Sequence, residues 1–370
     1  MFHFKHMFSP PAYLRLPAFG LDISDNSLKY IKLKEAYSGY RLQDFGEAKI
    51  PLGIIESGSI KKQNDFIGIL KETFGPKKHL RHVSLSLPEE KGFLRIIRLP
   101  KMSIPEINEA IPFQLEENVP LSAEEAAFDY EILPSANPKA DYLDILIVAF
   151  PKIIIDSYLD AIEEAGLTPI ALEMEAQAMA RAIISPEDLQ KTILVADIGL
   201  TRTGLFIVDH GLVEFTSTVP IGGRHINKAI MEAFGVPLEE AEKIKITHGL
   251  SQTPEGKKIA LALASIVNAI KEEATRRIDF WLAHAPTVIS GGKASPIEKM
   301  YLCGGDANLT GLSSYLSYEL KIPVSLADVW INAGQDSKYV PEIEFNKSLA
   351  YTTTIGLALG AARGETGQAG

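Results

Sequence analysis

Residues 19–33, FGLDISDNSLKYIKL, and residues 194–208, LVADIGLTRTGLFIV, follow the same pattern. Each begins with an apolar run that carries one Asp, continues through a short polar turn and ends in a second apolar run. Continuous apolar runs of this kind predict strands in the middle of a sheet that is covered on both faces. The two stretches therefore predict two polar hairpins in corresponding positions of a repeated unit.

The sequence around each hairpin extends the repeat. Residues 19–50 contain three strand-like runs, and a helical stretch near 65–74 and the alternating strand HVSLSLP at 82–88 follow them. Residues 191–223 again contain three strand-like runs, followed by helical segments. A three-stranded meander that is followed by helix and strand, and that occurs twice, predicts a duplicated α/β fold with two lobes.

A block with its own pattern separates the two copies. Residues 90–168 are predicted to form a strand, a helix, two strands and a second helix, which Gly166 ends. We interpret this block as an inserted subdomain. The predicted divisions are a flexible lead at 1–17, a first lobe at 18–89 plus 169–190, the insert at 90–168, a second lobe at 191–363 with a helical subdomain at about 222–290, and a disordered tail at 364–370.

The composition of the chain excludes several classes of function. The 370 residues are 46% hydrophobic and 23% charged, which is typical of a globular protein. The net charge of −10 argues against a nucleic-acid partner, because phosphate affinity needs clustered Lys and Arg. The single cysteine, Cys303, allows no intrachain disulfide and fits a reducing cytoplasm. The most apolar helical stretch has about a dozen apolar residues where a membrane span needs roughly 20, so we expect no direct span.

The first hairpin has the groups that an anion site needs. Asp22 ends a buried strand, and a turn follows that exposes backbone N–H groups and hydroxyls; its residues are Ser24, Asp25, Asn26 and Ser27. Lys29 lies on the returning strand, within reach of the same point. A carboxylate beside a bound phosphate would hold hydrated Mg²⁺, since Mg²⁺ keeps most of its waters. A turn with polar residues at its tip is the alternative interpretation of either hairpin alone.

The second hairpin offers similar groups in Asp197, Gly199, Thr201 and Thr203. Two such hairpins that face each other would form a nucleotide cleft. Two Gly-Gly pairs add to this prediction, because each lies between a strand and a helix, where backbone can approach a ligand. They are Gly222-Gly223 and Gly304-Gly305, the latter with Asn308 at the following helix start. Neither a P-loop nor a dinucleotide fingerprint is present.

These motifs together resemble the actin-like ATPase superfamily of actin, Hsp70 and sugar kinases, a ribonuclease-H-like fold. LDISDNSLK resembles its first phosphate motif, VADIGLTRTGLFIV the second and YLCGGDANLTGL the adenosine motif. AEKIK, with Glu242 and Lys245, is similar to the nucleotide-contacting helix of the bacterial members. EMEAQAMARAI and TTTIGLALGAA resemble the two helices that connect the lobes, where small residues permit a close crossing.

Within the superfamily, residues 18–363 resemble the PilM family of type IV pilus assembly proteins and, through it, FtsA. Long stretches outside the nucleotide motifs carry the likeness, such as FLRIIRLPKMSIPEINEAIPFQLEENVPL and DILIVAFPKIIIDSYLDAIEEAGLTPIALEMEAQAMARAI. The resemblance implies ATP or ADP with Mg²⁺, an insert of the 1C type and a groove for the cytoplasmic tail of the inner-membrane protein PilN. It further implies a cytoplasmic scaffold at the inner membrane that meets other pilus components indirectly, and a homo-oligomer is compatible with it.

The resemblance gives each candidate residue a role. Phosphates would contact Ser24, Asp25, Asn26, Ser27, Lys29, Gly199, Thr201, Thr203, Gly222 and Gly223. Adenosine would contact Glu242, Lys245, Gly304, Gly305 and Asn308, and Mg²⁺ would be held through water by Asp22 and Asp197. The candidates for the peptide groove lie on the first helix of the insert, and they are Ile107, Ile111, Phe113, Leu115 and Val119.

The first motif departs from the superfamily's usual Asp-x-Gly, because Ser24 stands where glycine is usual and restricts the backbone. No hydrolytic residue is assigned; Glu173, Glu175, Gln177 and Asp197 are the candidates, and we expect slow or absent turnover. Two alternatives remain at this point, a small-molecule kinase and an FtsA-like division protein. No cluster of sugar-binding residues supports the first, and the polar end ARGETGQAG has no amphipathic membrane helix to support the second.

Overall fold

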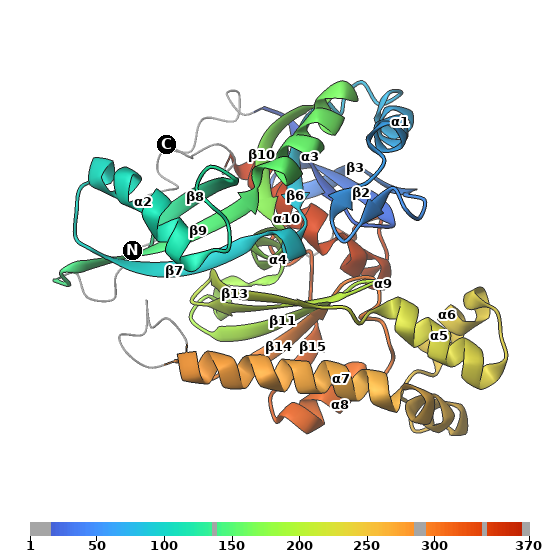
Figure 1. Ribbon diagram of the computed structural model, residues 1–370. Helices are drawn as coiled ribbons and strands as arrows, with labels where there is room; N and C mark the ends of the chain where they lie inside the picture. Colours follow the sequence, from blue (N-terminus) through green and yellow to red (C-terminus); the bar gives the residue numbers. More distant parts are fainter. Residues whose placement is uncertain (1–15, 135–138, 285–293, 335–338, 365–370) are drawn as a thin grey trace. The chain divides into compact units, whose positions relative to one another are not determined.

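The computed structural model describes residues 16–134, 139–284, 294–334 and 339–364 (Figure 1). The predicted lead at 1–17 and tail at 364–370 lie almost entirely outside these residues. The chain divides into two compact units. Unit 1 comprises Met1–Ile184, Val329–Glu342 and Tyr351–Gly370, and unit 2 comprises Ser185–Asp328 and Ile343–Ala350.

Unit 1 contains a five-stranded sheet in the order β10-β6-β1-β2-β3. The strands are β1 (Ala18–Ile23), β2 (Ser27–Ala36), β3 (Gly39–Lys49), β6 (His82–Leu87) and β10 (Thr168–Met174). β2 pairs antiparallel with β1 and with β3, whereas β6 pairs parallel with β1 and with β10. The apolar run of β1 is buried almost throughout, as its sequence predicts for a central strand.

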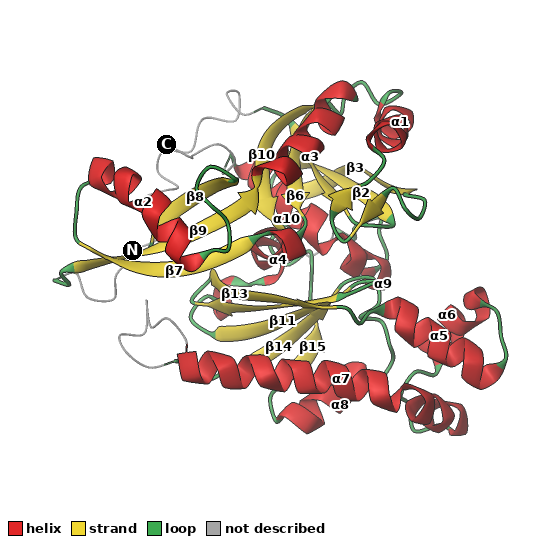
Figure 2. Cartoon of the chain, in the orientation of Figure 1, coloured by secondary structure: helices red, strands yellow, loops and turns green. Residues whose placement is uncertain are grey.

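Helices cover both faces of this sheet (Figure 2). On one face, α1 (Gln63–Phe74) and α3 (Lys152–Glu164) share a core with Phe19, Leu21 and Ile23 of β1. On the other face, α10 (Thr352–Arg363) crosses β1 so closely that a Cβ on Gly20 would lie 2.4 Å from the Thr354 oxygen. A short hairpin of β4 (Ile55–Glu56) and β5 (Ser59–Ile60) precedes α1.

The close helix crossing predicted for the two Ala- and Gly-rich segments is present. α4 (Glu175–Ile183) packs on α10, and a Cβ on Gly356 would lie 1.7 Å from the Ala178 carbonyl oxygen. This packing places α10 in unit 1, together with Val329–Glu342, although the sequence assigned all of 191–363 to the second lobe. The reason is burial: residues 352–361 are all buried in this packing, so α10 completes the core of unit 1.

The insert in unit 1 has the predicted order of strand, helix and two strands, but α3, the helix predicted to end it, packs on the main sheet because its apolar face belongs to the core around β1. β7 (Phe93–Pro100), α2 (Ile104–Asn118), β8 (Ala126–Ile132) and β9 (Tyr142–Pro151) form an antiparallel sheet in the order β7-β9-β8, with α2 packed on one face. The Ser103 N–H donates to the Glu106 carboxylate at 2.7 Å, which forms part of a capping box at the start of α2. The single turn η3 (Glu89–Lys91) leads from β6 into the insert.

Unit 2 repeats the topology of unit 1. Its sheet has the order β13-β12-β11-β14-β15, formed by β11 (Thr192–Ile198), β12 (Thr203–Asp209), β13 (Leu212–Val219), β14 (Lys299–Cys303) and β15 (Val324–Leu326). β11 and β12 are antiparallel, whereas β14 is parallel to both β11 and β15. The mixed sheets correspond strand for strand, so the predicted duplication is confirmed.

Most helices of unit 2 follow its meander. α5 (Gly223–Phe234), α6 (Leu238–Thr247) and the long α7 (Pro254–His284) form the predicted helical part, and α7 and α8 (Leu312–Leu320) lie side by side in Figure 1. The remaining short elements are η4 (Pro186–Asp188), α9 (Phe345–Ser348) and η5 (Leu349–Tyr351). Within the described ranges, every helix is too short or too polar to cross a lipid bilayer.

Candidate functional site

The turn between β1 and β2 closes on itself through its two serines. The Ser24 N–H and Oγ both donate to the Ser27 carbonyl oxygen, at 2.9 and 3.0 Å, and the Ser27 N–H donates to Ser24 Oγ at 3.2 Å. Lys29, which stands opposite Asp22 in the strand register, donates from Nζ to Ser27 Oγ at 2.8 Å. The predicted approach of the ammonium to the turn is therefore present.

Asp25 has a different role from the one predicted. Its two carboxylate oxygens accept the N–H groups of Ser57 at 3.1 Å and of Gly58 at 3.0 Å, in the turn of the β4–β5 hairpin. The carboxylate is therefore directed at protein amides and does not face a phosphate. A bound phosphate would also repel it, so the assignment of Asp25 to phosphate binding is corrected on this geometry.

The two aspartates that end β1 and β11 have similar positions but different neighbours. Asp22 Oδ1 accepts from Ser86 Oγ at 2.7 Å. Asp197 lies beside Gly304, where an added Cβ would be 2.5 Å from its Oδ1, and the φ of Gly304 is +91°. No group of three or more His, Cys, Asp or Glu in the described part of the chain could hold a metal directly. Single carboxylates of this kind fit Mg²⁺ held through water.

The N-terminus of α5 docks on the turn between β11 and β12 and uses most of its polar groups. The Gly223 N–H donates to the Gly199 carbonyl at 2.9 Å, and the Gly222 N–H points to His225 Nδ1 at 3.3 Å. Thr203 is fully buried and donates to the Ile221 carbonyl at 2.7 Å. The predicted phosphate contacts of Gly222, Gly223 and Thr203 are therefore replaced by contacts within the protein.

Position 222 requires glycine because the backbone of the β11–β12 turn approaches it closely. A Cβ on Gly222 would lie 2.4 Å from the Gly199 carbonyl oxygen and 2.7 Å from the Arg202 nitrogen. The Gly199 N–H itself donates to the Arg202 carbonyl at 2.9 Å. Thr201 lies at the tip of the turn and is half-buried, so it is the residue of the second hairpin that still fits the phosphate role.

One of the predicted adenosine residues, Lys245, pairs with a carboxylate that sequence reasoning missed. Lys245 is buried and donates from Nζ to Asp306 Oδ1 at 2.5 Å. Asp306 also lies against the first residue of α5, where its negative charge complements the helix N-terminus. Glu242 accepts from Asn227 at 3.4 Å, and Asn308 donates to the Asn346 carbonyl at 2.8 Å. The signal that could have revealed Asp306 is its position directly after Gly304-Gly305.

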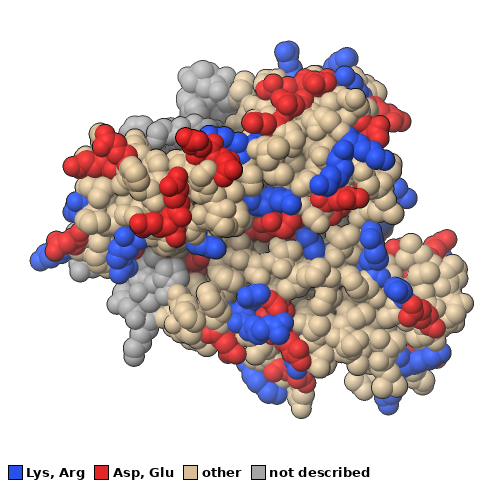
Figure 3. Space-filling view, in the orientation of Figure 1, with Lys and Arg blue, Asp and Glu red and all other residues tan. Residues whose placement is uncertain are grey.

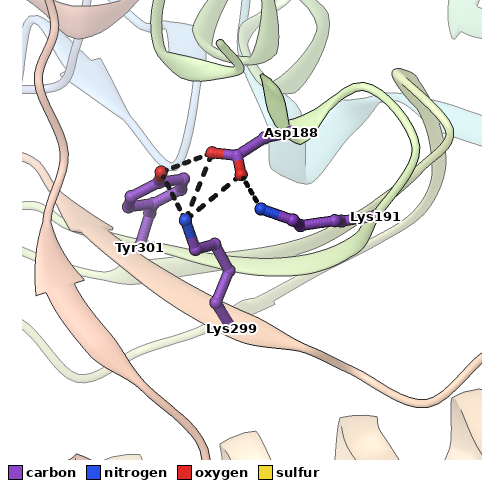
Figure 4. Close-up of polar contacts among 4 residues, drawn as sticks. All are labelled: Asp188, Lys191, Lys299 and Tyr301. Atoms are coloured by element: carbon purple, nitrogen blue, oxygen red, sulfur yellow. Dashed lines mark hydrogen bonds and ion pairs between the residues drawn. The ribbon is translucent and has the colours of Figure 1, made fainter. Parts of the chain in front are cut away.

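A second polar cluster anchors the start of unit 2 (Figure 4). Asp188 is 3% exposed and accepts from Lys191 at 2.7 Å, from Tyr301 at 2.6 Å and from Lys299 at 3.2 Å. Burial alone would raise the pKa of Asp188, but the bonds from Lys191, Tyr301 and Lys299 outweigh burial and hold that pKa well below its usual range. Burial and the Asp188 carboxylate raise the pKa of Tyr301. The cluster holds η4 to β14.

Four of the five predicted peptide-groove residues belong to the core of the insert. Ile107, Ile111 and Leu115 are fully buried and Val119 is 4% exposed, all packed against β7, β8 and β9. Only Phe113, on the outer side of α2, is exposed, at 71%. The groove assignment of the other four is corrected, because side chains that hold α2 on its sheet cannot line an open groove.

An open groove is present elsewhere in unit 1, between the insert and the strand β10. Its volume is about 290 Å³, and its apolar lining includes the partly exposed residues Phe128, Val148, Ile155 and Leu172 above the buried Leu87, Phe150 and Met174. Asp129, Glu131 and Glu173 add carboxylates to the lining. Glu173 pairs with Arg181 at 2.7 Å, so it is not a free base for hydrolysis. Gln177 also lines this groove, and Glu175 is buried.

The groove runs beside the outer edge of β8, which pairs with no other strand within the described residues. The Glu125 carbonyl accepts from Lys152 N–H and the Leu133 N–H donates to the Asp144 carbonyl, each at 2.8 Å. Because bonding alternates along an antiparallel strand, the peptide groups of Phe128, Tyr130 and Ile132 point away from β9. The Tyr130 N–H already donates to Asp129 Oδ1 at 2.8 Å, so the strand presents the peptide groups of Phe128 and Ile132 and the Tyr130 carbonyl next to an apolar groove.

The face drawn in Figure 3 shows Lys and Arg side chains interspersed with Asp and Glu. Acidic side chains gather over the insert, where the exposed residues of α2 and the following turn include Glu106, Glu109, Glu116, Glu117 and Glu124. A surface of mixed charge does not favour a phosphate backbone as partner. The groove therefore suits a peptide better than a nucleic acid.

Comparisons with known proteins agree with this architecture. The model of the family described as type IV pilus assembly protein PilM matches residues 20–362. A solved PilM-PilN type IV pilus biogenesis complex superposes with a TM-score of 0.76 at 23% identity, over 94% of this chain and 99% of that one. MreB5 of Spiroplasma citri bound to ADP superposes with a TM-score of 0.52 at 14% identity, over 87% of this chain and 94% of that one.

Among curated relatives, the cell division protein FtsA of Neisseria meningitidis serogroup B is 27% identical over 105 residues. The match covers 28% of this chain and 25% of FtsA, so the chain spans about a quarter of that relative's length. The structural likenesses confirm the predicted α/β fold of the actin-like ATPases.

Proposed function

Because the chain belongs to the PilM family of type IV pilus assembly proteins, we propose that it is a scaffold that binds the cytoplasmic tail of a PilN-like inner-membrane protein. The groove beside the outer edge of β8 is the observation that carries this proposal. An extended peptide that adds to a sheet edge gains main-chain hydrogen bonds, and side-chain pockets give it specificity. Binding to such a tail would bring the chain to the inner membrane through its partner.

The lining of the groove specifies the chemistry of the tail. The partly exposed apolar residues Val148, Ile155 and Leu172 suit apolar side chains of an extended peptide. Asp129 and Glu131, which are exposed on β8, suit a basic residue at the rim. The tail is therefore expected to be an extended segment with apolar residues and at least one Lys or Arg.

Peptide titration tests this site. A fluorescent peptide of the PilN-like tail is titrated with wild-type protein, with Val148→Trp, which fills the groove floor, and with Leu261→Trp, a matched change at an 81% exposed site on α7. Val148→Trp should weaken binding at least about tenfold, since it removes an anchor pocket. Equal affinity of Val148→Trp and the wild type would show that the tail binds elsewhere.

We further propose that the chain binds ATP or ADP with Mg²⁺ and turns it over slowly or not at all. The first hairpin supports this with the Lys29 ammonium at a turn of serines, and the second supports it with Asp197 beside Gly304. Mg²⁺ would neutralise phosphate charge when bound, and Asp22 and Asp197 would accept hydrogen bonds from its waters. Of the candidates for hydrolysis, Glu173 pairs with Arg181 and Glu175 is buried, so Asp197 and Gln177 are the groups that would act on a water.

Calorimetric titration of ADP with and without Mg²⁺ tests the nucleotide proposal. Removal of Mg²⁺ should weaken binding to the wild type, and Asp22→Asn and Asp197→Asn, tested separately, should each reduce that Mg²⁺ dependence. Glu109→Gln, on the exposed side of α2, is the matched control. Absence of any heat of ADP binding to the wild type at millimolar ligand would reject the proposal, and the tail-binding proposal would stand independently.

A further inference from the structure

The candidate phosphate turn of unit 1 is hydrogen-bonded to the β4–β5 hairpin. Asp25 caps the N–H groups of Ser57 and Gly58, whose φ angles are +45° and +70°. The backbone of Ser57 lies in the left-handed region, which few residues other than glycine adopt without cost. The two bonds to Asp25 therefore help to hold the hairpin turn in this conformation.

The opposite side of the same hairpin turn is bonded to α3. Tyr158 is fully buried, and its hydroxyl donates to the Gly58 carbonyl at 3.2 Å. An added Cβ on Gly58 would lie 2.5 Å from Pro88, so the turn is also confined by the segment that leads into the insert. Gly58 thus receives Asp25 on its N–H and Tyr158 on its carbonyl.

The helix α3 also forms part of the wall of the groove beside β8, which is called the tail groove below. It begins directly after β9, the central strand of the insert, and the Lys152 N–H at its start donates to the Glu125 carbonyl beside β8. Ile155, one turn before Tyr158, lines the groove. A displacement of α3 at Tyr158 would therefore change the wall of the groove.

We propose that Asp25 and Tyr158 are positioning residues that couple the β1–β2 turn to the tail groove through the β4–β5 hairpin. The inference rests on the proposed function, since it needs both ligands. A phosphate at the turn repels the Asp25 carboxylate and keeps it on the Ser57 and Gly58 amides. The hairpin then holds Tyr158 and α3 in place, so nucleotide tightens tail binding and tail tightens nucleotide binding by the same factor.

The experiment measures this coupling factor. Affinity for the fluorescent tail peptide is determined with and without saturating ADP and Mg²⁺, for the wild type, Tyr158→Phe and Tyr315→Phe. Tyr158→Phe removes one hydroxyl and keeps the ring, and Tyr315→Phe removes a hydroxyl that lies 3.4 Å from Asn268 in unit 2. The wild type and Tyr315→Phe should bind the tail about fivefold tighter or more with nucleotide. Tyr158→Phe should show a factor near one with nearly unchanged affinity for nucleotide alone.

Amide hydrogen exchange is a second measurement, and the pattern expected in it would not arise from a loss of stability alone. Nucleotide should slow the exchange of the Ser57 and Gly58 amides in the wild type and also in Tyr158→Phe. The reason is that the bonds from Asp25 to these amides lie between the nucleotide turn and Tyr158 on the proposed route, so they form without the Tyr158 hydroxyl. Asp25→Asn, which cannot be repelled as a charge and offers one acceptor instead of two, should abolish that slowing.

The outcomes separate the inference from the proposed function. A wild type that binds tail and nucleotide without mutual effect overturns the coupling and leaves the scaffold proposal standing. Full coupling in a folded Tyr158→Phe overturns the route through Gly58. A wild type that binds neither ligand overturns the proposed function and the coupling together.

Discussion

The two hairpins are copies in strand order, yet their turns are stabilised differently. Asp22 and Asp197 end corresponding strands, and each faces the returning strand in register, opposite Lys29 and Gly204. In unit 1 the turn residues bond to one another and to a small hairpin nearby. In unit 2 the turn receives the N-terminus of α5 on its carbonyls. Duplication thus conserves the sheet, and the elements added after each meander determine which polar groups remain for a ligand.

The largest effect is expected from a substitution that disrupts the docking of α5 in unit 2. Gly222→Ala places a Cβ within 2.4 Å of the Gly199 carbonyl oxygen, against backbone that cannot rotate away. We expect it to lower the free energy of unfolding by about 3 kcal/mol, the upper range for overpacking. Chemical denaturation followed by circular dichroism measures the change. The control is Gly68→Ala within α1, where an added Cβ meets nothing within 4 Å and a gain of about 0.5–1 kcal/mol is expected.

The next effect concerns the ionic anchor of the second sheet. Asp188→Asn keeps the shape but removes the charge that Lys191 and Lys299 share, and we expect a loss of about 2 kcal/mol at pH 7. Both lysines are partly exposed and can turn toward water, which keeps the loss below that of a fully buried pair.

The pH dependence of stability identifies the same carboxylate. The folded pKa of Asp188 is depressed, so its stabilisation is fully present above the unfolded value of about 3.9 and disappears as pH falls toward the folded pKa. Asp188→Asn should therefore destabilise the protein at pH 7 and differ less from the wild type at pH 3. A difference that stays constant from pH 7 to pH 3 would assign the effect to packing.

How far the sequence predicted these features depends on the kind of contact. The family resemblance gave the close crossing of the two small-residue helices, and periodicity correctly gave the repeated meander and the strand order of the insert, because each depends on local burial or residue size. It misassigned α10 and the groove residues on α2. Ile107, Ile111 and Leu115 recur every four residues, and such a stripe indicates a buried face without showing what covers it.

The site was predicted less completely than the fold. Lys29 reaches its turn as expected, but Asp25, Thr203 and Gly222 bond to protein groups that lie 18 to 33 residues away or pack on distant backbone. A turn sequence shows which polar groups are available, whereas the partner that uses them is fixed by tertiary structure. The buried Lys245–Asp306 pair was missed for the same reason, since 61 residues separate its members.

A smaller effect tests whether the two turns contribute unequally to nucleotide binding. Lys29→Met removes the one ammonium at the first turn and should weaken ADP binding about tenfold, the value of one charge-assisted contact. Thr201→Val removes a hydroxyl from the second turn and should cost about threefold, as for a neutral hydrogen bond. Calorimetry with Mg²⁺ present measures both. Equal losses would contradict the asymmetry of the two turns.

The smallest effect concerns Ser24, which stands where related motifs carry glycine. The described residues with side chains at positive φ are Ser57, His210 and Lys321, so Ser24 adopts a backbone conformation that does not require glycine. Ser24→Gly removes the Oγ bonds to Ser27, and we expect a loss of about 0.5–1 kcal/mol in stability. Because the turn keeps its Ser24 N–H bond to the Ser27 carbonyl, ADP affinity should change less than about twofold, within the spread of one weak contact. A tenfold gain in affinity would instead show that the serine hydroxyl blocks the phosphate.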